Sequence, residues 1–436
     1  MIPSVRLLGS VAALFPLAVA AAAWPAWSAG VLAVGAALAA AAMFDAWWSH
    51  GLLDGLRTSA EETRFHKDRA APFHSLLAGG PQSGLRLRVG IPWPDGLEAE
   101  AEEQLTALTA SPDPVNLRWM LTPRLRGDFH IPALYCACPS RLGLWEVHSQ
   151  CKLSATIRVY PNLQSPDELL AIRGYATGEH AHRQIGRGRE FEHLREYVPG
   201  DGYDEIDWKA TARRGKPISR VFQVERTQDV YAVVDASRLT ARPATPGGAE
   251  ARLERYIQAA LALGMVAQKQ GDRYGVITFT DRLHDLVPSG RGSAQSALCR
   301  QALYRLQPAP IPPDFEDVAS QLRIQLKGRA LLVFLTDLDD PSAAAGFATA
   351  AALLSRKHLV AALSIRPAGA EPLFSQDAAG ENDLYRQLGG HMQWKKLNET
   401  QARLRSLGVV FRLAAHDSLS RELAGLYVDI KRRQLL

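Results

Sequence analysis

Cysteine is scarce in this sequence, with four residues in a chain of 436. Four cysteines cannot form a disulfide framework for a chain of this length, and their scarcity favours a reducing compartment. A zinc site would need Cys136, Cys138, Cys151 and His148 together; we expect the cysteines to be buried small hydrophobic residues instead. The sequence also lacks the G-x-x-x-x-G-K-[ST] motif of P-loop ATPases and the G-x-S-x-G motif of hydrolases.

Charge of neither sign dominates. The chain has 50 Lys and Arg against 45 Asp and Glu, a net charge of +5, and most of the basic residues are Arg. The basic residues are interspersed with acidic ones, so we do not expect a nucleic-acid partner. With 47% hydrophobic and 22% charged residues, the composition is that of a globular protein and excludes a wholly disordered chain.

The first fifty residues contain two apolar runs, Leu7–Trp24 and Trp27–Trp48, separated by Pro25. Each is near the roughly 20 residues that a helix needs to cross a membrane. A cleaved signal peptide is the alternative, but the second run favours a transmembrane helical hairpin. Basic residues flank the pair and are missing from the turn, which predicts that both ends are cytoplasmic. We therefore expect a multi-pass protein of the inner (cytoplasmic) membrane with cytoplasmic soluble domains.

Composition and periodicity divide the chain into five intervals. We expect a transmembrane helical hairpin over 1–50, a juxtamembrane linker over 51–71, a small β-sandwich-like domain over 72–165, a connector over 166–228 and an α/β domain over 229–436. Short alternating segments indicate the β-sandwich, with one possible helical period over Leu97–Leu108. Apolar strands between amphipathic helices indicate a Rossmann-like parallel sheet covered on both faces. The segment Pro367–Asn398 has no clear pattern.

Candidate functional residues follow two of the apolar strands, Val230–Val234 and Ala330–Thr336. Asp235 and Ser237 come after the first strand, and Asp337 comes after the second. Because ligands bind beyond the carboxyl ends of strands in open α/β sheets, these residues form a candidate partner- or metal-binding edge. Their oxygen atoms suit Mg²⁺. The alternative is that the aspartates cap helices or hold loops in a metal-free fold.

This pattern resembles the metal site of the von Willebrand factor A-type domain, which uses Asp-x-Ser-x-Ser with a Thr and a later Asp. Asp235 and Ser237 match the first two places, Leu239 stands at the second Ser, and Thr240 is one position off. The resemblance implies a von Willebrand A-like fold, with either no cofactor or Mg²⁺ at Asp235, Ser237 and Asp337 in a degenerate site.

The connector contains charged residues of both signs among aromatic ones. An ion-pair network through Arg195, Glu196, Asp201, Asp207, Arg213 and Glu225 would clasp the two domains; a docking surface for a partner is the alternative. Fourteen positions fit the signature EF-x-x-LR-x-Y-x-PGD-x-x-x-x-IDW-x-A-x-AR in order: Glu190, Phe191, Leu194, Arg195, Tyr197, Pro199, Gly200, Asp201, Ile206, Asp207, Trp208, Ala210, Ala212 and Arg213. On these residues the chain is identified as a member of the bacterial domain-of-unknown-function 58 family, a similarity that covers nearly the whole chain.

That resemblance implies a membrane-anchored protein with a von Willebrand A-like domain, often encoded near a MoxR-type AAA+ ATPase, and it supplies no catalytic residues. We expect a non-enzymatic adaptor or assembly factor that presents this domain to a cytoplasmic partner. One alternative is a metal-dependent hydrolase built on Asp235 and Asp337, for which no general base or nucleophile is evident. Another is a binder of anionic lipid or nucleic acid, which strong salt dependence would reveal.

Overall fold

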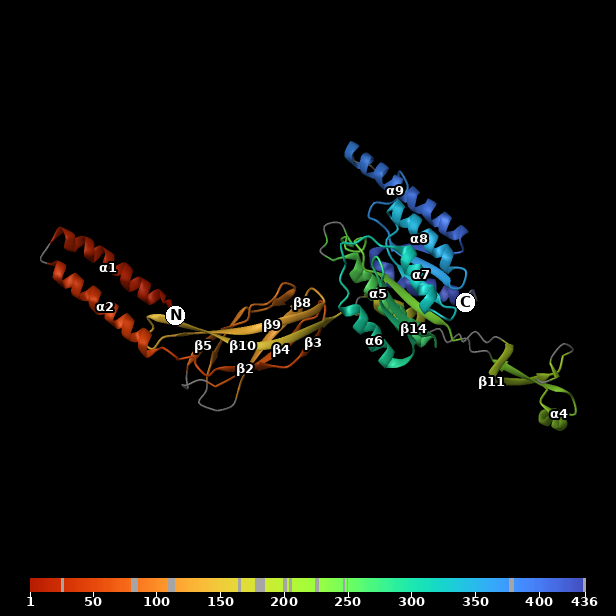
Figure 1. Cartoon of the computed structure of the whole chain (residues 1–436), viewed down its shortest axis with the longest axis horizontal. Coiled ribbons are helices and arrows are strands. Elements are labelled where there is room, and N and C mark those ends of the chain that lie inside the picture. Colours follow the sequence, from red (N-terminus) through yellow and green to blue (C-terminus); the bar gives the residue numbers. More distant parts are fainter. Residues whose placement is uncertain are drawn as a thin grey trace. The chain divides into compact units, whose positions relative to one another are not determined.

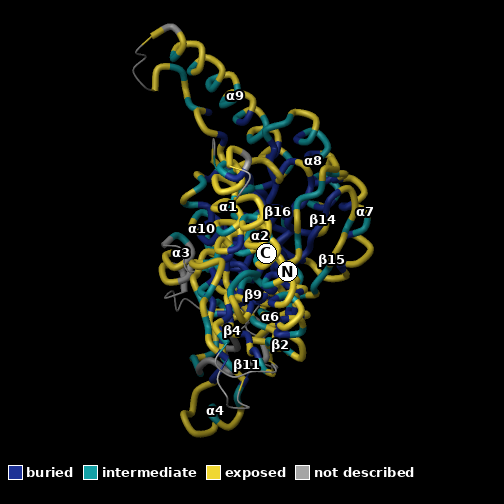
Figure 2. The backbone as a smooth tube through the Cα atoms, turned by 90° about the vertical axis from the view of Figure 1, so that its left-hand side faces the viewer, coloured by how far each residue is buried: buried dark blue, intermediate teal, exposed yellow. Residues whose placement is uncertain are grey.

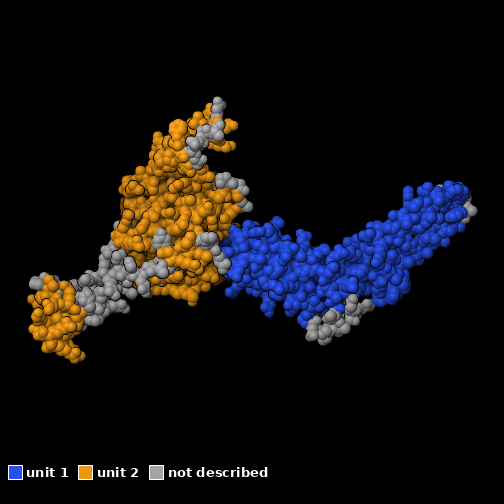
Figure 3. Space-filling model, turned by 180° about the vertical axis from the view of Figure 1, so that it is seen from behind, with its two compact units in different colours: residues 1–162 blue, residues 163–436 orange. Residues whose placement is uncertain are grey.

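The computed structural model has two compact units, Met1–Asn162 and Leu163–Leu436 (Figure 3). It describes all residues except 25–26, 80–84, 109–113, 164–165, 177–184, 199–201, 204–205, 224–226, 246–247, 249, 376–379 and 434–436. The boundary lies close to the expected end of the β-rich domain at residue 165.

Two apolar helices open unit 1, α1 (Val5–Ala23) and α2 (Ser28–Trp48), and they pack side by side (Figure 1). Helix α2 is long and apolar enough to cross a membrane, and only 11% of its most apolar window is buried. Helix α1 contains the shorter apolar stretch Val5–Ala21. Both apolar runs of the sequence therefore form helices whose apolar side chains lie mostly on the surface.

The rest of unit 1 consists of two β-sheets that share one apolar core. The strands are β1 (Ile2–Pro3), β2 (Arg57–Ala60), β3 (Thr63–His66), β4 (Ala71–Ala78), β5 (Arg86–Gly90), β6 (Leu97–Ala99), β7 (Glu103–Ala107), β8 (Val115–Pro123), β9 (Gly127–Pro139) and β10 (Trp145–Tyr160). One sheet has the order β1-β10-β9-β5-β7, with β3 also paired to β10; the other has the order β2-β4-β8-β6. The core between them includes Phe73 and Trp119 from one sheet and Ile131 and Ile157 from the other, all at most 1% exposed.

Two intervals of unit 1 differ from expectation. The expected linker 51–71 contributes strands β2 and β3, which pair with β4 and β10. The possible helical period over Leu97–Leu108 was wrong, because this segment forms β6 and β7. Pairing with β8 and β5 satisfies the backbone groups of these short strands, whatever helical period their sequence carries. All four cysteines are buried, as expected, and none of them forms a disulfide.

Asp45, in the last turn of α2, joins the helices to the β-sheets of the same unit. Its carboxylate is fully buried. It accepts hydrogen bonds from Ser140 Oγ at 2.5 Å, Leu142 N at 3.0 Å, Leu144 N at 3.2 Å and Ser49 Oγ at 3.2 Å. Three of these donors lie in the turn between β9 and β10, so one side chain fixes that turn to the end of the helix.

Replacing Asp45 with Ala should release the β9–β10 turn, because Leu142 N, Leu144 N and Ser140 Oγ all lose their acceptor. Each charge-assisted hydrogen bond contributes about 1.5–3 kcal/mol. We expect the amides of Leu142 and Leu144 to exchange hydrogen at least tenfold faster in the detergent-solubilised variant, measured by mass spectrometry. The exposed Asp54→Ala is the control. Unchanged exchange in Asp45→Ala would contradict this role.

Unit 2 is built on a six-stranded sheet with the order β15-β14-β13-β16-β17-β18. Its strands are β13 (Asp229–Asp235), β14 (Arg273–Phe279), β15 (Leu283–Gly290), β16 (Leu331–Leu335), β17 (Leu359–Ile365) and β18 (Val410–Ala414). All neighbouring pairs are parallel except β14 with β15, the antiparallel edge strand. From β13 the chain adds β14 and β15 on one side and β16, β17 and β18 on the other, so a crevice is expected beyond the carboxyl ends of β13 and β16.

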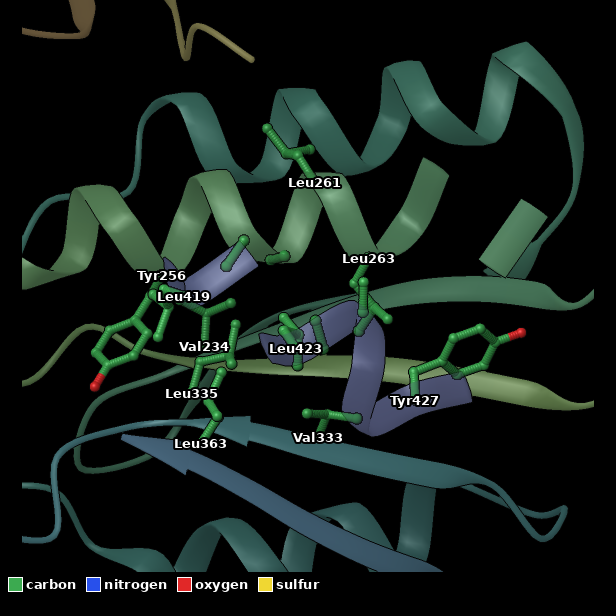
Figure 4. Close-up of a cluster of buried hydrophobic side chains, with 14 of the residues drawn as sticks. Val234, Tyr256, Leu261, Leu263, Val333, Leu335, Leu363, Leu419, Leu423 and Tyr427 are labelled. Atoms are coloured by element: carbon green, nitrogen blue, oxygen red, sulfur yellow. The ribbon is translucent and has the colours of Figure 1, made fainter. Parts of the chain in front are cut away.

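Helices cover both faces of this sheet, as the uninterrupted apolar strands predict. They are α3 (Pro166–Ala176), α5 (Arg252–Lys269), α6 (Gly292–Tyr304) and α10 (Leu419–Arg432) on one face, and α7 (Phe315–Gln325), α8 (Pro341–Leu354) and α9 (Glu381–Ser406) on the other. Val230, Ala232 and Val234 of β13 face the first set, and Tyr231 and Val233 face the second. Figure 4 shows Val234, Leu335 and Leu363 from three strands beneath the side chains of α5 and α10.

Two elements of unit 2 differ from the expected boundaries. Helix α3 opens the interval 166–228 but packs against α5 and α10 of the α/β layer. Helix α9 covers most of the unassigned segment Pro367–Asn398. Its first half exposes apolar residues such as Leu384 and Met392 instead of burying one stripe, and Figure 2 shows this half as mostly exposed. A helix without a buried stripe has no periodic signal in the sequence.

His358, directly before β17, should make unit 2 sensitive to acid. Its ring is 3% exposed, and neither ring nitrogen has a hydrogen-bond partner within the described residues. Burial, with a smaller effect from Lys357, lowers the pKa of His358. Below a pH of about 6.5, the usual pKa of histidine, His358 is protonated in the unfolded chain but stays neutral in the folded chain. The free energy of unfolding therefore decreases as the pH falls.

We therefore expect the melting temperature of His358→Leu to fall less than that of the wild type between about pH 7.5 and pH 5.5. Thermal scans of both proteins across this range measure the difference. The exposed His130→Leu serves as the control and should follow the wild type. Parallel curves for wild type and His358→Leu would disprove the assignment.

Candidate functional site

The candidate edge lies where β13 and β16 end side by side. Their parallel register pairs Val234 with Leu335. The next residues, Asp235 and Thr336, are therefore neighbours although 101 positions separate them. Asp337 follows immediately. The expectation that Asp235 and Asp337 meet at one sheet edge matches this geometry.

Asp235 is fully buried and hydrogen-bonded through both oxygens. Oδ2 accepts from Thr336 Oγ1 at 2.5 Å, and Oδ1 accepts from the amide of Ser237 at 2.8 Å. Burial raises the pKa of Asp235 to about 6, against the opposing effect of these hydrogen bonds. The hydroxyl of Ser237 accepts from the amide of Leu239 at 3.3 Å, and Thr240 Oγ1 donates to the Asp235 carbonyl at 3.0 Å. The first candidate loop is thus closed by its own backbone and hydroxyl groups.

Asp337, 1% exposed, is held by two residues of α5. Tyr256 donates its hydroxyl to Oδ1 at 2.7 Å, and Nη1 of Arg252 lies 2.9 Å from Oδ2. The same Tyr256 hydroxyl accepts from the amide of Ile365 at the end of β17, at 3.0 Å. Burial raises the pKa of Asp337, and the charge of Arg252 opposes that rise.

Two further aspartates, Asp339 and Asp340, follow Asp337 and are partly buried. Asp339 Oδ2 accepts from Nη1 of Arg242 at 2.8 Å and lies 3.9 Å from Nη1 of Arg252. Asp340 accepts from the amides of Ser342 and Ala343 and caps the start of α8. Asp340 is thus the N-cap residue of α8.

The residues present do not fit a divalent metal ion. Both oxygens of Asp235 are hydrogen-bonded within the chain, and both oxygens of Asp337 face side chains of α5. Leu239, at the place of the second Ser, is apolar and 1% exposed. A cation such as Mg²⁺ needs these oxygens free and repels a guanidinium. Among the described residues no group of three or more His, Cys, Asp or Glu is arranged to hold a metal.

Arg252 and Tyr256 are the site residues that sequence reasoning missed. Arg252 is the first residue of α5, where the positive end of the helix dipole disfavours a cation. A basic residue at the start of a predicted helix could therefore have indicated a nearby carboxylate. Tyr256 lies on the same face four positions later, and only the fold shows that its hydroxyl reaches Asp337.

The connector residues form a hairpin of β11 (Ile185–Glu196) and β12 (Ile218–Gln223) with the short helix α4 (Trp208–Arg214) between them. Glu190, Phe191 and Arg195 lie on β11, paired with Gln223, Phe222 and Ser219 of β12. Trp208, the first residue of α4, is 68% exposed, and Arg213 lies in its last turn. Pro199, Gly200 and Asp201 lie outside the described residues.

The expected ion-pair network is only partly described. Asp207 accepts from the amide of Ala210 at 2.9 Å and caps α4, while Glu196 pairs with Lys216 at 3.5 Å. Tyr197 stacks on Tyr203 with ring centroids 6.5 Å apart. These contacts lie within the connector, so the interdomain clasp stays a prediction.

Residues 193–373, from β11 through β17, match the family model described as "Protein of unknown function DUF58". The chain resembles the DUF58 family over this interval. Relatives with some similarity to this chain include the uncharacterized protein YeaD of Bacillus subtilis, 27% identical over 112 residues, 25% of this chain. The uncharacterized protein Rv1480 of Mycobacterium tuberculosis is 27% identical over 175 residues, 39% of this chain. The matches cover 28% and 53% of these relatives' own lengths.

Among solved structures, this chain is similar to the conserved hypothetical protein BatB from Bacteroides thetaiotaomicron. The likeness covers 47% of this chain and 99% of that one, with 12% identity and a TM-score of 0.31.

Replacing Thr336 with Val should destabilise unit 2, because the fully buried Asp235 carboxylate loses a hydroxyl donor. A buried group left with one hydrogen bond fewer costs about 1–3 kcal/mol. We expect a lower melting temperature for Thr336→Val in thermal scans. Thr349→Val removes an exposed hydroxyl from α8 and should change the melting temperature little. Equal melting temperatures for both variants would show that the Thr336–Asp235 bond is unimportant.

Proposed function

We propose that this chain is a membrane-anchored, non-enzymatic adaptor or assembly factor of a bacterial inner membrane. In this proposal α1 and α2 both cross the bilayer, and unit 2 serves a cytoplasmic protein partner. The apolar, largely unburied surface of α2 supports the anchor. Arg6 at the start of α1 and Arg57, Arg64 and Lys67 after α2 support cytoplasmic soluble parts by the positive-inside rule.

We propose that unit 2 is a von Willebrand A-like domain. The strand order, the single antiparallel edge strand β15 and the helices on both faces support this assignment. Asp235 and Ser237 after β13, together with Asp337 after β16, support it at the level of the site.

The observation that carries the adaptor function is a groove of about 350 Å³ that starts at the strand-end edge and runs between α8 and α9. Its apolar lining comes from Leu338, Ala344, Ala345, Ala348, Leu397 and Leu404, and its charged lining comes from Asp339, Lys396, Glu399 and Arg403. An apolar floor with charges of both signs suits an apolar side chain of a partner segment flanked by charged residues.

The chemistry of the edge favours binding over hydrolysis. A general base needs an accessible lone pair near its substrate. The carboxylates of Asp235 and Asp337 are buried, and their oxygens are occupied by side chains and backbone amides of the chain itself. For the partner, the family resemblance points to a MoxR-type AAA+ ATPase, which would dock on the groove.

Ala345 offers a direct test, because it lies half-buried on α8 in the lining of the groove. Ala345→Arg should fill the groove and weaken the binding of a purified MoxR-type ATPase from the same bacterium at least about tenfold, or 1.4 kcal/mol. Biolayer interferometry on the detergent-solubilised full chain measures the dissociation constant.

The matched control is Thr349→Arg, which adds the same side chain one turn later, at an exposed position of α8 outside the groove lining. It should bind like the wild type. If both variants bind as the wild type does, the groove is not the docking site. If the wild type binds only anionic vesicles and releases them in salt, the lipid-binding alternative replaces the adaptor.

A further inference from the structure

A buried carboxylate needs a nearby positive charge or several hydrogen-bond donors, because burial strongly disfavours the ionised form. Asp337 has one neutral donor, the Tyr256 hydroxyl, and one cation, Arg252. The Arg252 side chain is itself only 10% exposed. In the described part of the chain, Nη1 of Arg252 and Oδ2 of Asp337 have no hydrogen-bond partner elsewhere. The two charged groups thus face each other in a nearly closed space.

The surroundings of Arg252 show that the ion pair holds it in place. Arg252 begins α5, where its charge opposes the helix dipole. Its Nε reaches the carbonyl of Pro243 only at 3.4 Å, and its amide donates to the carbonyl of Arg242 at 2.9 Å. Asp339, 3.9 Å from Nη1, adds a second negative group on the same side.

We propose that Arg252 is a built-in cation: its guanidinium supplies to Asp337 the positive charge that a divalent metal ion would otherwise supply at such a strand-end edge. The edge is therefore assembled without metal. Asp235 agrees with this assignment, since its two oxygens are satisfied by Thr336 and Ser237 and require no cation. The inference concerns how the edge is built and holds whether or not the groove binds a partner.

The first test measures metal binding by the full-length chain in detergent micelles, with Mn²⁺ as the probe. Paramagnetic resonance of free Mn²⁺ should show no saturable site up to millimolar concentration. The melting temperature in excess Mg²⁺ should lie within about 1 °C of that in EDTA, because a ligand that does not bind cannot stabilise. One saturable Mn²⁺ site that disappears in Asp337→Asn would overturn the proposal.

The second test removes the cation. Arg252→Met keeps much of the side-chain length but leaves Asp337 buried without a counter-charge, and the melting temperature should fall by on the order of 10 °C. Arg242→Met is the matched control, because it breaks the Arg242–Asp339 pair at the same edge with a 46% exposed Arg side chain. Its melting temperature should fall by about 3 °C or less.

The double variant Arg252→Met/Asp337→Asn distinguishes charge balance from packing. If Arg252 acts as the cation for Asp337, neutralising the carboxylate should restore at least half of the melting temperature lost in Arg252→Met. A double variant as unstable as Arg252→Met would show that the Arg252 stem matters through packing alone, and would refute the built-in cation. The Mn²⁺ measurement on the wild type decides independently if Arg252→Met fails to fold.

Discussion

The parallel pairing of β13 with β16 is the constraint on which the strand-end edge depends. It brings Asp235 next to Thr336 and aims Asp337 at α5. Because both strands are covered by helices on either face, the polar residues that follow them cannot reach water and must find partners inside. Tyr256 meets this need twice, donating to Asp337 and accepting from the end of β17.

A closed polar network has a consequence for recognition. Groups that are buried and mutually hydrogen-bonded stiffen the edge, but they offer little to a partner. In the proposed docking, a partner would contact the more accessible groups, namely the 46% exposed Arg242 side chain and the groove between α8 and α9. Asp339 is part of the groove lining and also lies 3.9 Å from Nη1 of Arg252, in the buried network. The rigid interior thereby holds the first turn of α8, and with it one wall of the groove.

Much of this architecture could be predicted from sequence, and the reason lies in periodicity. Uninterrupted apolar runs predicted β13 and β16, and the carboxyl ends of two such strands bring Asp235 and Asp337 to one edge if the strands are neighbours. The first half of α9 gave no signal because it buries no stripe, and the strands of 97–107 gave a misleading one. The groove depends on how two helices pack, which no local pattern encodes.

Each unit contains one residue whose charge is unfavourable for the helix end at which it lies. Asp45 lies at the negative end of α2, and Arg252 lies at the positive end of α5. Each placement costs about 0.3–1 kcal/mol against the helix dipole. A single hydrogen bond to a charged group returns about 1.5–3 kcal/mol, and Asp45 accepts four. A charge of the unfavourable sign at a helix end therefore indicates a tertiary contact whose stabilisation exceeds the cost of opposing the helix dipole. In this chain one such charge fixes the apolar helices to their β-sheets, and the other neutralises the strand-end edge.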